Sequence, residues 1–505
     1  MAEMIVFAVA LAVAPIAAIG RTKPNIVFIL TDDLGFGDVG FTCSTRTNVL
    51  ARLRTPCLDR LAREGVVLTA HYAAAPVSAP SRASLITGRV QGKCSLRDNC
   101  FDRAFTETNT LASVLHGVGY TTWAVGKWGI AGGGESGEKV ASHPLDRGFD
   151  YFYGFLDHLA GHTYYHYNGR LNGAFMGITE NREDATSSAI GIYSTDLFVA
   201  KAKQLVARHA AEKSKTPFFL YLAMNTIHGS GRCDDTLETK TPLHVPGRPY
   251  PPGGVSWPLQ PEPFKSRNTW IDPAYRDFPE PAARYATAIA RLDTALADFM
   301  GEIARLGLDR NTMVVFTSDN GPADEYGADP RFFGSNGPFD GYKRDVFEGG
   351  MRVPAFVRWP ERIKAGSKDD APSQFHDWMA TLADAADASV PPETEGVSLL
   401  PRWNEKTTAQ ATPSLVYSQY EFPWGGRTEA FREFESRKAP VRGLQQMLRA
   451  GDYVALRTRI REGNARTRLY NVVEDPFQKN DLSGLAEQKD RLRDMERTLA
   501  ERLCR

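Results

Sequence analysis

The chain has 505 residues, more than a single hydrophobic core usually serves, so we expect one large domain and a smaller one. Lys and Arg together number 60, as do Asp and Glu, and the formal net charge is zero. This balance argues against attraction of the whole molecule to nucleic acid or to an anionic membrane. Recognition of an anionic ligand therefore has to be local.

The N-terminus is typical of a secretory signal peptide, with an apolar run from Ile5 to about Ile19 followed by small residues. Its first residues include Glu3 and no Lys or Arg, so a buried first strand or a lipid-proximal anchor is the alternative. No later segment of the sequence is long and apolar enough for a membrane-spanning helix. We predict a signal peptide over residues 1–20, a periplasmic or secreted protein, and no integral membrane segment.

The chain contains six cysteines, and export would allow them to form disulfides. Cys94 and Cys100 are the closest pair in sequence, and buried free thiols are the alternative to pairing. The spacing of the cysteines matches no zinc-binding pattern. The six are Cys43, Cys57, Cys94, Cys100, Cys233 and Cys504.

The first predicted strand runs from Ile26 to Leu30 in "PNIVFILTDD" and is followed by Asp32 and Asp33. Its continuous apolar character is typical of a strand buried on both faces of a parallel sheet. Next comes "PVSAPSRASLITGR", where Pro80 suits the first turn of a helix. Ser78 then lies just before the helix N-terminus, where free backbone N–H groups and the helix dipole favour an anion. The alternative is that Ser78 merely caps the helix.

Strands and helices alternate further along the chain. "PFFLYLAMN" from Pro217 predicts another buried strand, and apolar residues at three- and four-residue steps predict a helix over residues 281–307. A strand from Thr312 in "TMVVFTSDNG" ends at Asp319 and Asn320. This order predicts an α/β fold with a large, mostly parallel sheet sandwiched by helices, whose ligands gather beyond the carboxyl ends of the strands.

The last hundred residues have a different character, with shorter and more polar segments. "MLRAGDYVALRTRIREG" contains a central turn signal, and a charged helix is predicted from about Leu485 to Leu503. We therefore predict a catalytic-type domain over 21–400 and a smaller C-terminal α+β domain, an antiparallel sheet plus a helix, over 401–505. Residues 229–280, rich in Pro and Gly, are interpreted as a long surface excursion near the site.

Four polar side chains follow two of the predicted strands: Asp32, Asp33, Asp319 and Asn320. Carboxylates that converge are tolerable only around a cation, and an all-oxygen set suits calcium or magnesium. A zinc hydrolase would be expected to have His among these ligands, so Asn320 favours the harder ion. The alternative is that these acids cap helices or lie in turns.

Several motifs in this order resemble those of the formylglycine-dependent sulfatases of the alkaline phosphatase-like superfamily. "SAPSRASLITGR" resembles the family signature, and "KPNIVFILTDDLGFGDVG" its first strand. "VGKWG" and "FTSDNGP" are similar to its sulfate-binding lysine motif and its second metal motif. "YKRDVFEGGMRVPAFVRWP" and "LYNVVEDPFQKNDLSG" resemble its distal lysine segment and its C-terminal motif. The resemblance covers nearly the whole chain and implies a sulfuric ester hydrolase.

The resemblance implies that Ser78 is oxidised to formylglycine by a serine-type maturation enzyme. One hydroxyl of the hydrated aldehyde attacks sulfur to form a sulfo-enzyme, and deprotonation of the other expels sulfate. An unmodified serine would have no easy way to release sulfate. Many relatives have Cys at this position, so an engineered or natural inactive variant remains open.

The resemblance also assigns the roles of other residues. Asp32, Asp33, Asp319 and Asn320 hold Ca²⁺, with Mg²⁺ the less favoured ion, together with residue 78. Arg82 orients residue 78 and neutralises charge, and Lys127 and Lys343 bind sulfate oxygens. His228 contacts sulfate and protonates the leaving oxygen. The alternative for each lysine is an exposed position, and for His228 a structural hydrogen bond.

One position departs from the family pattern. Gly129 in "GKWGIAGGG" stands where many sulfatases have a histidine that helps to deprotonate the hydrate. The segment "YGFLDHLAGHTYYHYNG" offers His158, His162 and His166, and His162 is favoured for that catalytic role. His158 and His166 are then substrate-binding candidates, and the alternative is that these histidines only line a sugar subsite or the surface.

The organic half of the substrate is interpreted as a sulfated carbohydrate, such as a galactan. Aromatic residues, including Tyr164, Tyr165, Tyr167 and Trp424, suit a sugar ring, although they could equally be ordinary packing. "GLQQMLRAGDYVALR" resembles C-terminal segments of polysaccharide sulfatases, where polar residues such as Gln446 reach the substrate. The rival hypotheses are a catalytically silent glycan-binding homologue and a phosphodiesterase or phosphonate hydrolase on the same scaffold.

Overall fold

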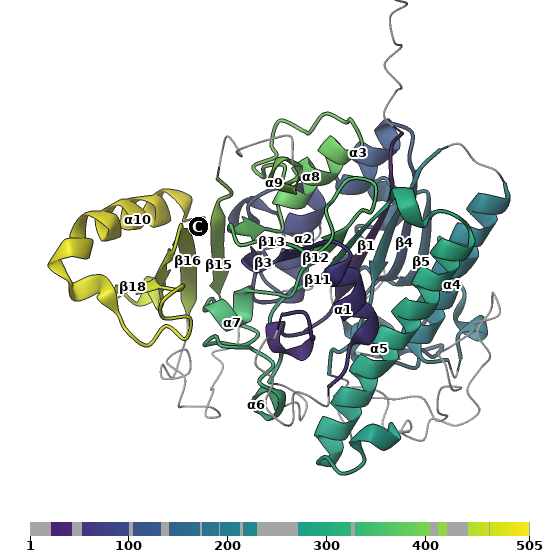
Figure 1. Ribbon diagram of the computed structural model, residues 1–505, viewed down its shortest axis with the longest axis horizontal. Coiled ribbons are helices and arrows are strands. Elements are labelled where there is room, and N and C mark those ends of the chain that lie inside the picture. The colour runs from purple at the N-terminus through teal and green to yellow at the C-terminus, as the bar shows by residue number, and fades with distance from the viewer. Residues whose placement is uncertain are drawn as a thin grey trace, which may run out of the picture.

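The computed structural model describes twelve stretches of the chain, which are residues 22–42, 53–99, 105–132, 141–171, 174–190, 192–212, 216–229, 271–324, 329–403, 413–421, 443–463 and 465–503. The chain forms a large sheet covered by helices, with a smaller C-terminal sheet and helix beside it (Figure 1). The predicted fold class is therefore confirmed.

A ten-stranded sheet forms the centre of the molecule, in the order β13-β2-β12-β11-β1-β10-β4-β5-β8-β9. The five central strands, β11-β1-β10-β4-β5, are all parallel, whereas β12, β8 and β9 pair antiparallel with their neighbours. The strands are β1 (Asn25–Thr31), β2 (Val66–Leu68), β4 (Thr121–Lys127), β5 (Tyr151–Phe155), β8 (Thr179–Glu180), β9 (Glu183–Asp184), β10 (Phe218–Ala223), β11 (Thr312–Ser318), β12 (Phe356–Arg358) and β13 (Ser367–Asp369).

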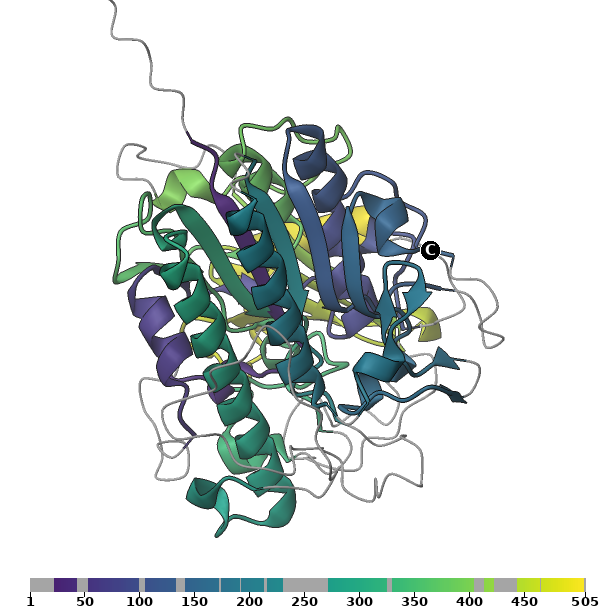
Figure 2. The same cartoon turned by 90° about the vertical axis from the view of Figure 1, so that its right-hand side faces the viewer.

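Helices cover both faces of this sheet, since alternate side chains of its strands point to opposite faces. Val27 and Ile29 of β1 share an apolar cluster with α1, α4 and α5. Ile26 and Phe28 pack into a second cluster with α2, α3 and α8. Figure 2 shows α4 and α5 side by side in front of the strands. The helices are α1 (Pro56–Arg63), α2 (Ser78–Thr87), α3 (Leu111–Gly117), α4 (Ser194–Ala211), α5 (Glu280–Arg305) and α8 (Asp377–Ala385).

The C-terminal part contains a four-stranded antiparallel sheet, in the order β15-β16-β17-β18. Alternation along β16 directs Met447 towards Tyr72 and Val77 of the large domain and Leu448 towards α10. Its elements are β15 (Val416–Glu421), β16 (Leu444–Ala450), β17 (Tyr453–Arg457), β18 (Thr467–Asn471) and α10 (Lys489–Arg502). The remaining short elements are β3 (His71–Tyr72), β6 (Arg170–Leu171), β7 (Ala174–Phe175), β14 (Ser373–Gln374), α6 (Pro330–Phe333), α7 (Glu348–Met351) and α9 (Leu400–Trp403).

Some sequence predictions are refined by the structure, and others fall outside it. Ser78 is the first residue of α2, with Val77 as its N-cap, rather than the residue before the helix. Cys57 and Cys94 are buried free thiols. The predicted signal peptide and most of the excursion over 229–280 lie outside the described residues. Within the described part of the chain, no helix has the length and apolarity needed to cross a membrane.

Candidate active site

The carboxyl ends of β1 and β11 bring the predicted acidic residues together. The two strands are parallel neighbours with Thr31 opposite Ser318, so the residues that follow them meet at one edge of the sheet. The backbone N–H of Asp33 donates to Asp319 Oδ1 at 3.2 Å, and Asn320 Nδ2 donates to Asp33 Oδ1 at 2.7 Å. These side chains are almost completely buried, as is that of Asp32.

Ser78 lies against this group of oxygen atoms. Its Oγ donates to Asp32 Oδ1 at 3.1 Å and lies 3.5 Å from Asn320 Oδ1. The backbone reaches this point because Val77, in extended conformation, packs in the apolar cluster between the large domain and the C-terminal sheet. The start of α2 thus presents the Ser78 hydroxyl to the ends of β1 and β11.

Three cationic side chains complete the site, each paired with a carboxylate. Arg82, one turn after Ser78 in α2, donates from Nε and Nη2 to Asp319 Oδ2 at 3.0 and 2.7 Å. Lys127, the last residue of β4, donates from Nζ to Asp32 Oδ2 at 2.5 Å. Lys343 donates from Nζ to Asp33 Oδ2 at 2.8 Å. All three cations are almost completely buried, so neither lysine is an exposed side chain.

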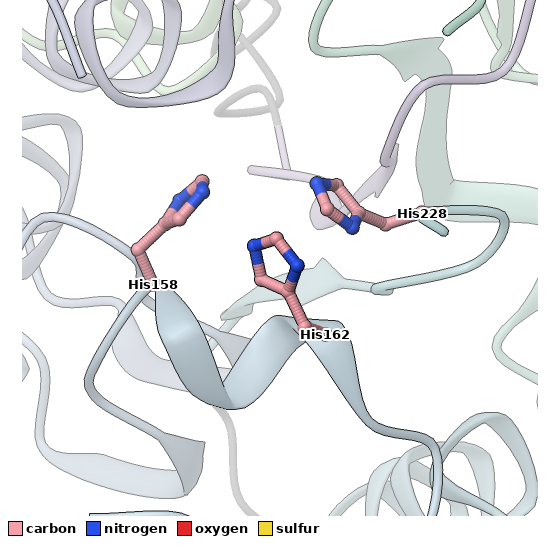
Figure 3. A group of neighbouring side chains, drawn as sticks. All are labelled: His158, His162 and His228. Carbon is pink, nitrogen blue, oxygen red and sulfur yellow. The ribbon is translucent and has the colours of Figure 1, made fainter. Parts of the chain in front are cut away.

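Three neighbouring histidines (Figure 3) lie beside these groups, since His228 contacts Lys343. His158 and His162 lie at the two ends of a short 3-10 helix, and His228 lies beyond β10. The ring centroids of His162 and His228 are 4.4 Å apart, and those of His158 and His162 are 5.5 Å apart. His228 Nδ1 lies 2.9 Å from the Gly229 carbonyl oxygen and its Nε2 lies 3.1 Å from Lys343 Nζ.

Comparison with known proteins agrees with this geometry. A sulfatase family model matches residues 24–388, which includes every charged residue of the site. The chain belongs to the sulfatase family. Arylsulfatase J of Mus musculus is 32% identical over 74% of this chain, and steryl-sulfatase of Mus musculus is 30% identical over 75% of it. The chain spans 54% and 64%, respectively, of the length of these two relatives.

A solved structure supports the relationship over almost the entire chain. The crystal structure of Ps i-CgsB in complex with k-i-k-neocarrahexaose has a TM-score of 0.71 and 25% sequence identity with this sulfatase. The match covers 95% of this chain and 94% of the other. The likeness therefore includes the C-terminal sheet as well as the large domain.

Burial and neighbouring charges change the pKa values of this sulfatase site in opposite directions. Burial alone would raise the pKa of Asp32, but the positive charges of Lys127 and Arg82 hold it well below its usual range. Burial raises the pKa of Asp33 to about 6 despite Lys343. Burial followed by Asp32 raises the pKa of Asp319. Burial, followed by the positive charge of Lys343, lowers the pKa of His228, so its imidazole is favoured in the neutral form.

The oxygen donors of this site fit a hard divalent cation. Asp32 Oδ1, Ser78 Oγ and Asn320 Oδ1 are oxygen atoms separated by 3.1 and 3.5 Å, the order of spacing found around an ion with bonds of about 2.3–2.6 Å. Asp33 and Asp319 supply further carboxylate oxygens beside them. Such a concentration of buried carboxylates favours a cation between them.

Two predicted substrate-binding residues lie away from this site. His166 is fully buried, with its ring against Phe155 and Phe198 and its Nδ1 3.1 Å from the Met176 carbonyl oxygen. Gln446 is also fully buried and donates from Nε2 to Tyr417 Oη and to the Leu499 carbonyl oxygen, both at 2.8 Å. Neither position supports contact with a substrate.

Other residues have roles that the sequence did not indicate. Tyr164 and Tyr165, interpreted as sugar-facing aromatics, are fully buried, and Tyr164 stacks on Tyr193. Tyr164 Oη donates to the carbonyl oxygen of His228 at 3.1 Å, so it supports the backbone that carries this histidine. Gln445, next to Gln446, faces the large domain and places its Nε2 3.4 Å from the Arg344 carbonyl oxygen. The alternation of β16 could have indicated this difference, but its register was not known.

Proposed function

We propose that this protein hydrolyses sulfate esters of a carbohydrate, using a formylglycine formed from Ser78 and a bound Ca²⁺ ion. The observation that carries the proposal is that one hydroxyl, three carboxylates, three cations and three imidazoles lie together in one buried site. The family relationship supports the same reaction, because the relatives are named sulfatases.

The charges of the site support an anionic substrate together with a divalent ion. Arg82, Lys127 and Lys343 offset the three carboxylates one for one. A Ca²⁺ ion adds two positive charges, which a sulfate monoester and a deprotonated nucleophile, each with one negative charge, would balance. Bound Ca²⁺ would polarise a sulfate oxygen and lower the pKa of the nucleophile.

The first bond to break is the one between sulfur and the substrate's alcohol oxygen. A hydroxyl of the hydrated residue 78 gives its proton to one of the adjacent carboxylates and attacks sulfur, and the alcohol leaves with a second proton, supplied by His228. Since His228 Nδ1 faces the Gly229 carbonyl oxygen, Nε2 is the atom that donates this proton. An anionic ester near Nε2 raises the pKa of His228 and so opposes the effect of Lys343. Lys127 and Lys343 bind the remaining sulfate oxygens.

Release of sulfate needs a base for the second hydroxyl of residue 78. We assign this role to His162, which lies in ring contact with His228. Gly129 has a positive φ of 72°, and a Cβ there would lie 3.0 Å from Lys127 Cε, so a larger residue at this position is disfavoured. The short helix that ends at His162 also passes close to Lys127, because a Cβ added at Gly161 would lie 3.6 Å from Lys127 Cδ and Cε. His162 therefore supplies an imidazole close to Lys127, in place of the histidine that many sulfatases have at the position of Gly129.

The carbohydrate class of the substrate is supported by the relative in complex with k-i-k-neocarrahexaose, an oligosaccharide. A sulfated galactan is the form of this proposal that we favour. Three residues were expected to bind the substrate: His158, His166 and Gln446. Of these, His158 has the position that supports contact, because its ring lies beside those of His162 and His228. A serine-type maturation enzyme and secretion to the periplasm or beyond complete the proposal.

The test is the mass of the peptide that contains residue 78, from protein matured in its host or with a serine-type maturation enzyme. We expect a loss of two hydrogen atoms relative to serine and reactivity with a carbonyl probe. The same preparation should release sulfate from sulfated galactan oligosaccharides, and a Ser78→Ala variant should not. Intact serine, with saturable oligosaccharide binding and no turnover, would contradict the proposal and favour a glycan-binding protein.

A further inference from the structure

The three histidines of the site form a compact cluster of nitrogen donors. One nitrogen from each of His158, His162 and His228 lies within 4.8 Å of the other two, and all three side chains are buried (Figure 3). Their rings point towards a common centre from the 3-10 helix at Leu159–His162 and from the segment after β10. The cluster adjoins the oxygen set through His228, because one His228 nitrogen also lies within 4.8 Å of oxygens of Asp32 and Asp33, but the donors of the cluster itself are all imidazole nitrogens.

This chemistry differs from that of the calcium-type set. Imidazole suits borderline ions such as Zn²⁺, whereas carboxylate and amide oxygens suit Ca²⁺ and Mg²⁺. Three imidazoles with an open fourth position are a known arrangement for Zn²⁺, with Zn–N bonds of about 2.0–2.1 Å. Ligand atoms around such an ion are roughly 3.3 Å apart, so these side chains need to close by at most about 1.5 Å. Rotation about the side-chain torsions of three imidazoles can supply this movement.

The charged groups that face the cluster do not exclude a cation. Lys343 Nζ contacts His228 Nε2 but is also paired with Asp33 at 2.8 Å, and Lys127 is paired with Asp32 at 2.5 Å. Asp33 Oδ2 itself lies 3.7 Å from His228 Nε2. Each nearby ammonium group is thus offset by a carboxylate when the oxygen set holds no ion.

We propose that His158, His162 and His228 form a second metal site, which binds a borderline transition metal ion such as Zn²⁺ through three imidazoles. His228 Nε2 exchanges its contact with Lys343 for the metal, and Lys343 retains Asp33. An ion in the oxygen set adds positive charge beside the cluster, so Ca²⁺ and Zn²⁺ weaken each other's binding. If the proposed sulfatase mechanism holds, bound Zn²⁺ also withdraws His162 and His228 from proton transfer and inhibits turnover.

The test measures metal binding and not activity, so that it stands apart from the proposed function. The probe is Co²⁺ added to calcium-free Ser78→Ala protein, in which residue 78 cannot be matured. Four-coordinate Co²⁺ with nitrogen ligands absorbs visible light far more strongly than six-coordinate Co²⁺ with oxygen ligands. X-ray absorption of the Zn²⁺-loaded protein then gives the number of imidazole ligands.

Four further substitutions in the same background locate the ion. His158→Ala and His162→Ala each remove one ligand, and Asp319→Ala removes a member of the oxygen set only. His116→Ala is the matched control, because the His116 side chain is 56% exposed on the surface. Circular dichroism and thermal unfolding establish that each variant is folded, and His158→Gln and His162→Gln replace any alanine variant that is not.

We expect strong visible bands with one equivalent of Co²⁺, weaker affinity in the presence of Ca²⁺, and three imidazole ligands around Zn²⁺. Loss of a histidine ligand should reduce the affinity by at least about 10–100-fold, whereas His116→Ala and Asp319→Ala should retain the bands. Absence of strong bands, or bands that survive both histidine substitutions, would overturn the site. Loss of binding only in Asp319→Ala would assign the ion to the oxygen set, and this result would also overturn the three-histidine site.

Discussion

His162 illustrates how one side chain determines whether a catalytic cycle closes. The proposed attack on sulfur needs Ser78, the cations and His228, whereas release of sulfate needs a base for the second hydroxyl. His162 is in ring contact with His228 at a centroid distance of 4.4 Å, and Gly129 offers no side chain. In the proposed mechanism, attack and release therefore depend on different imidazoles.

This separation predicts the behaviour of a His162→Ala variant. The first step should proceed, while the second should slow by about 10²–10⁴-fold, the usual contribution of a general base. A sulfo-enzyme should therefore accumulate, visible as added mass on the residue 78 peptide after brief exposure to substrate. A variant that turns over at the wild-type rate, without the adduct, would remove His162 from this role. His116→Ala, on the surface, is the control.

The sequence predicted that Ser78, Arg82 and the acidic residues lie close together, as they do in the structure, but not the orientation of every neighbour. Motifs located Ser78 and Arg82 because helix and strand termini fix where such residues can lie. The substrate contacts of Gln446 and His166 were expected from resemblance and local sequence, whereas the structure buries both side chains in packing contacts, since the direction of a side chain depends on strand register and on loop packing. Gln445 and Gln446 are neighbours in β16 and point to opposite faces of the sheet, so an error of one residue in the expected register assigns each side chain to the wrong face.

At the scale of elements, a side chain of α5 caps the N-terminus of α1. Asp293 of α5 accepts hydrogen bonds from the backbone N–H groups of Cys57 and Leu58 at 3.0 and 2.9 Å. These groups belong to the first turn of α1, whose N–H groups have no partner within the helix. Thr55, the N-cap residue, makes no side-chain hydrogen bond of this kind, so a distant carboxylate supplies the cap.

The pH dependence of this cap follows from its burial. Burial raises the pKa of Asp293 to about 7, above the value of about 3.9 expected in the unfolded chain. Between these values the folded state binds more protons than the unfolded state, so stability falls as the pH rises from about 4 to about 7. Asp293→Asn should lose this dependence, worth up to about 4 kcal/mol. The measurement is the free energy of unfolding by denaturant at pH 5 and at pH 8 for both proteins. The same change in this free energy between the two pH values in wild type and Asp293→Asn would contradict the prediction.

Elements with a strong periodic pattern were the ones that the sequence predicted well. The helix expected over 281–307 is α5 (Glu280–Arg305), and the strand expected over Ile26 to Leu30 is β1 (Asn25–Thr31). α5 buries apolar residues at three- and four-residue steps, and β1 buries its whole apolar run. The start of α2 was displaced by one residue, from just after Ser78 to Ser78 itself, because a proline fits more than one position of a first turn.

At the scale of the whole molecule, the C-terminal sheet is joined to the large domain by a buried polar network as well as by apolar contacts. Arg449 of β16 donates to Tyr72 Oη, and Tyr72 in turn donates to Glu348 at 2.7 and 2.9 Å. The backbone N–H of Glu348 donates to Gln478 Oε1 at 2.9 Å. Met447 packs in one cluster with Val77, the residue before Ser78. The two parts therefore share the region that positions the proposed nucleophile.

This interface predicts that the two parts unfold together. Scanning calorimetry should show one cooperative transition for the matured protein, and activity should be lost over the same temperature range. Arg449→Met leaves the buried Tyr72 hydroxyl without its donor and should destabilise that single transition by about 1–3 kcal/mol. Arg461→Met is the matched control, since Arg461 forms an exposed ion pair with Glu421 in which its side chain is 65% exposed, and such pairs contribute little. Two resolved transitions, with only the smaller one sensitive to Arg449→Met, would show that the C-terminal sheet folds independently of the site.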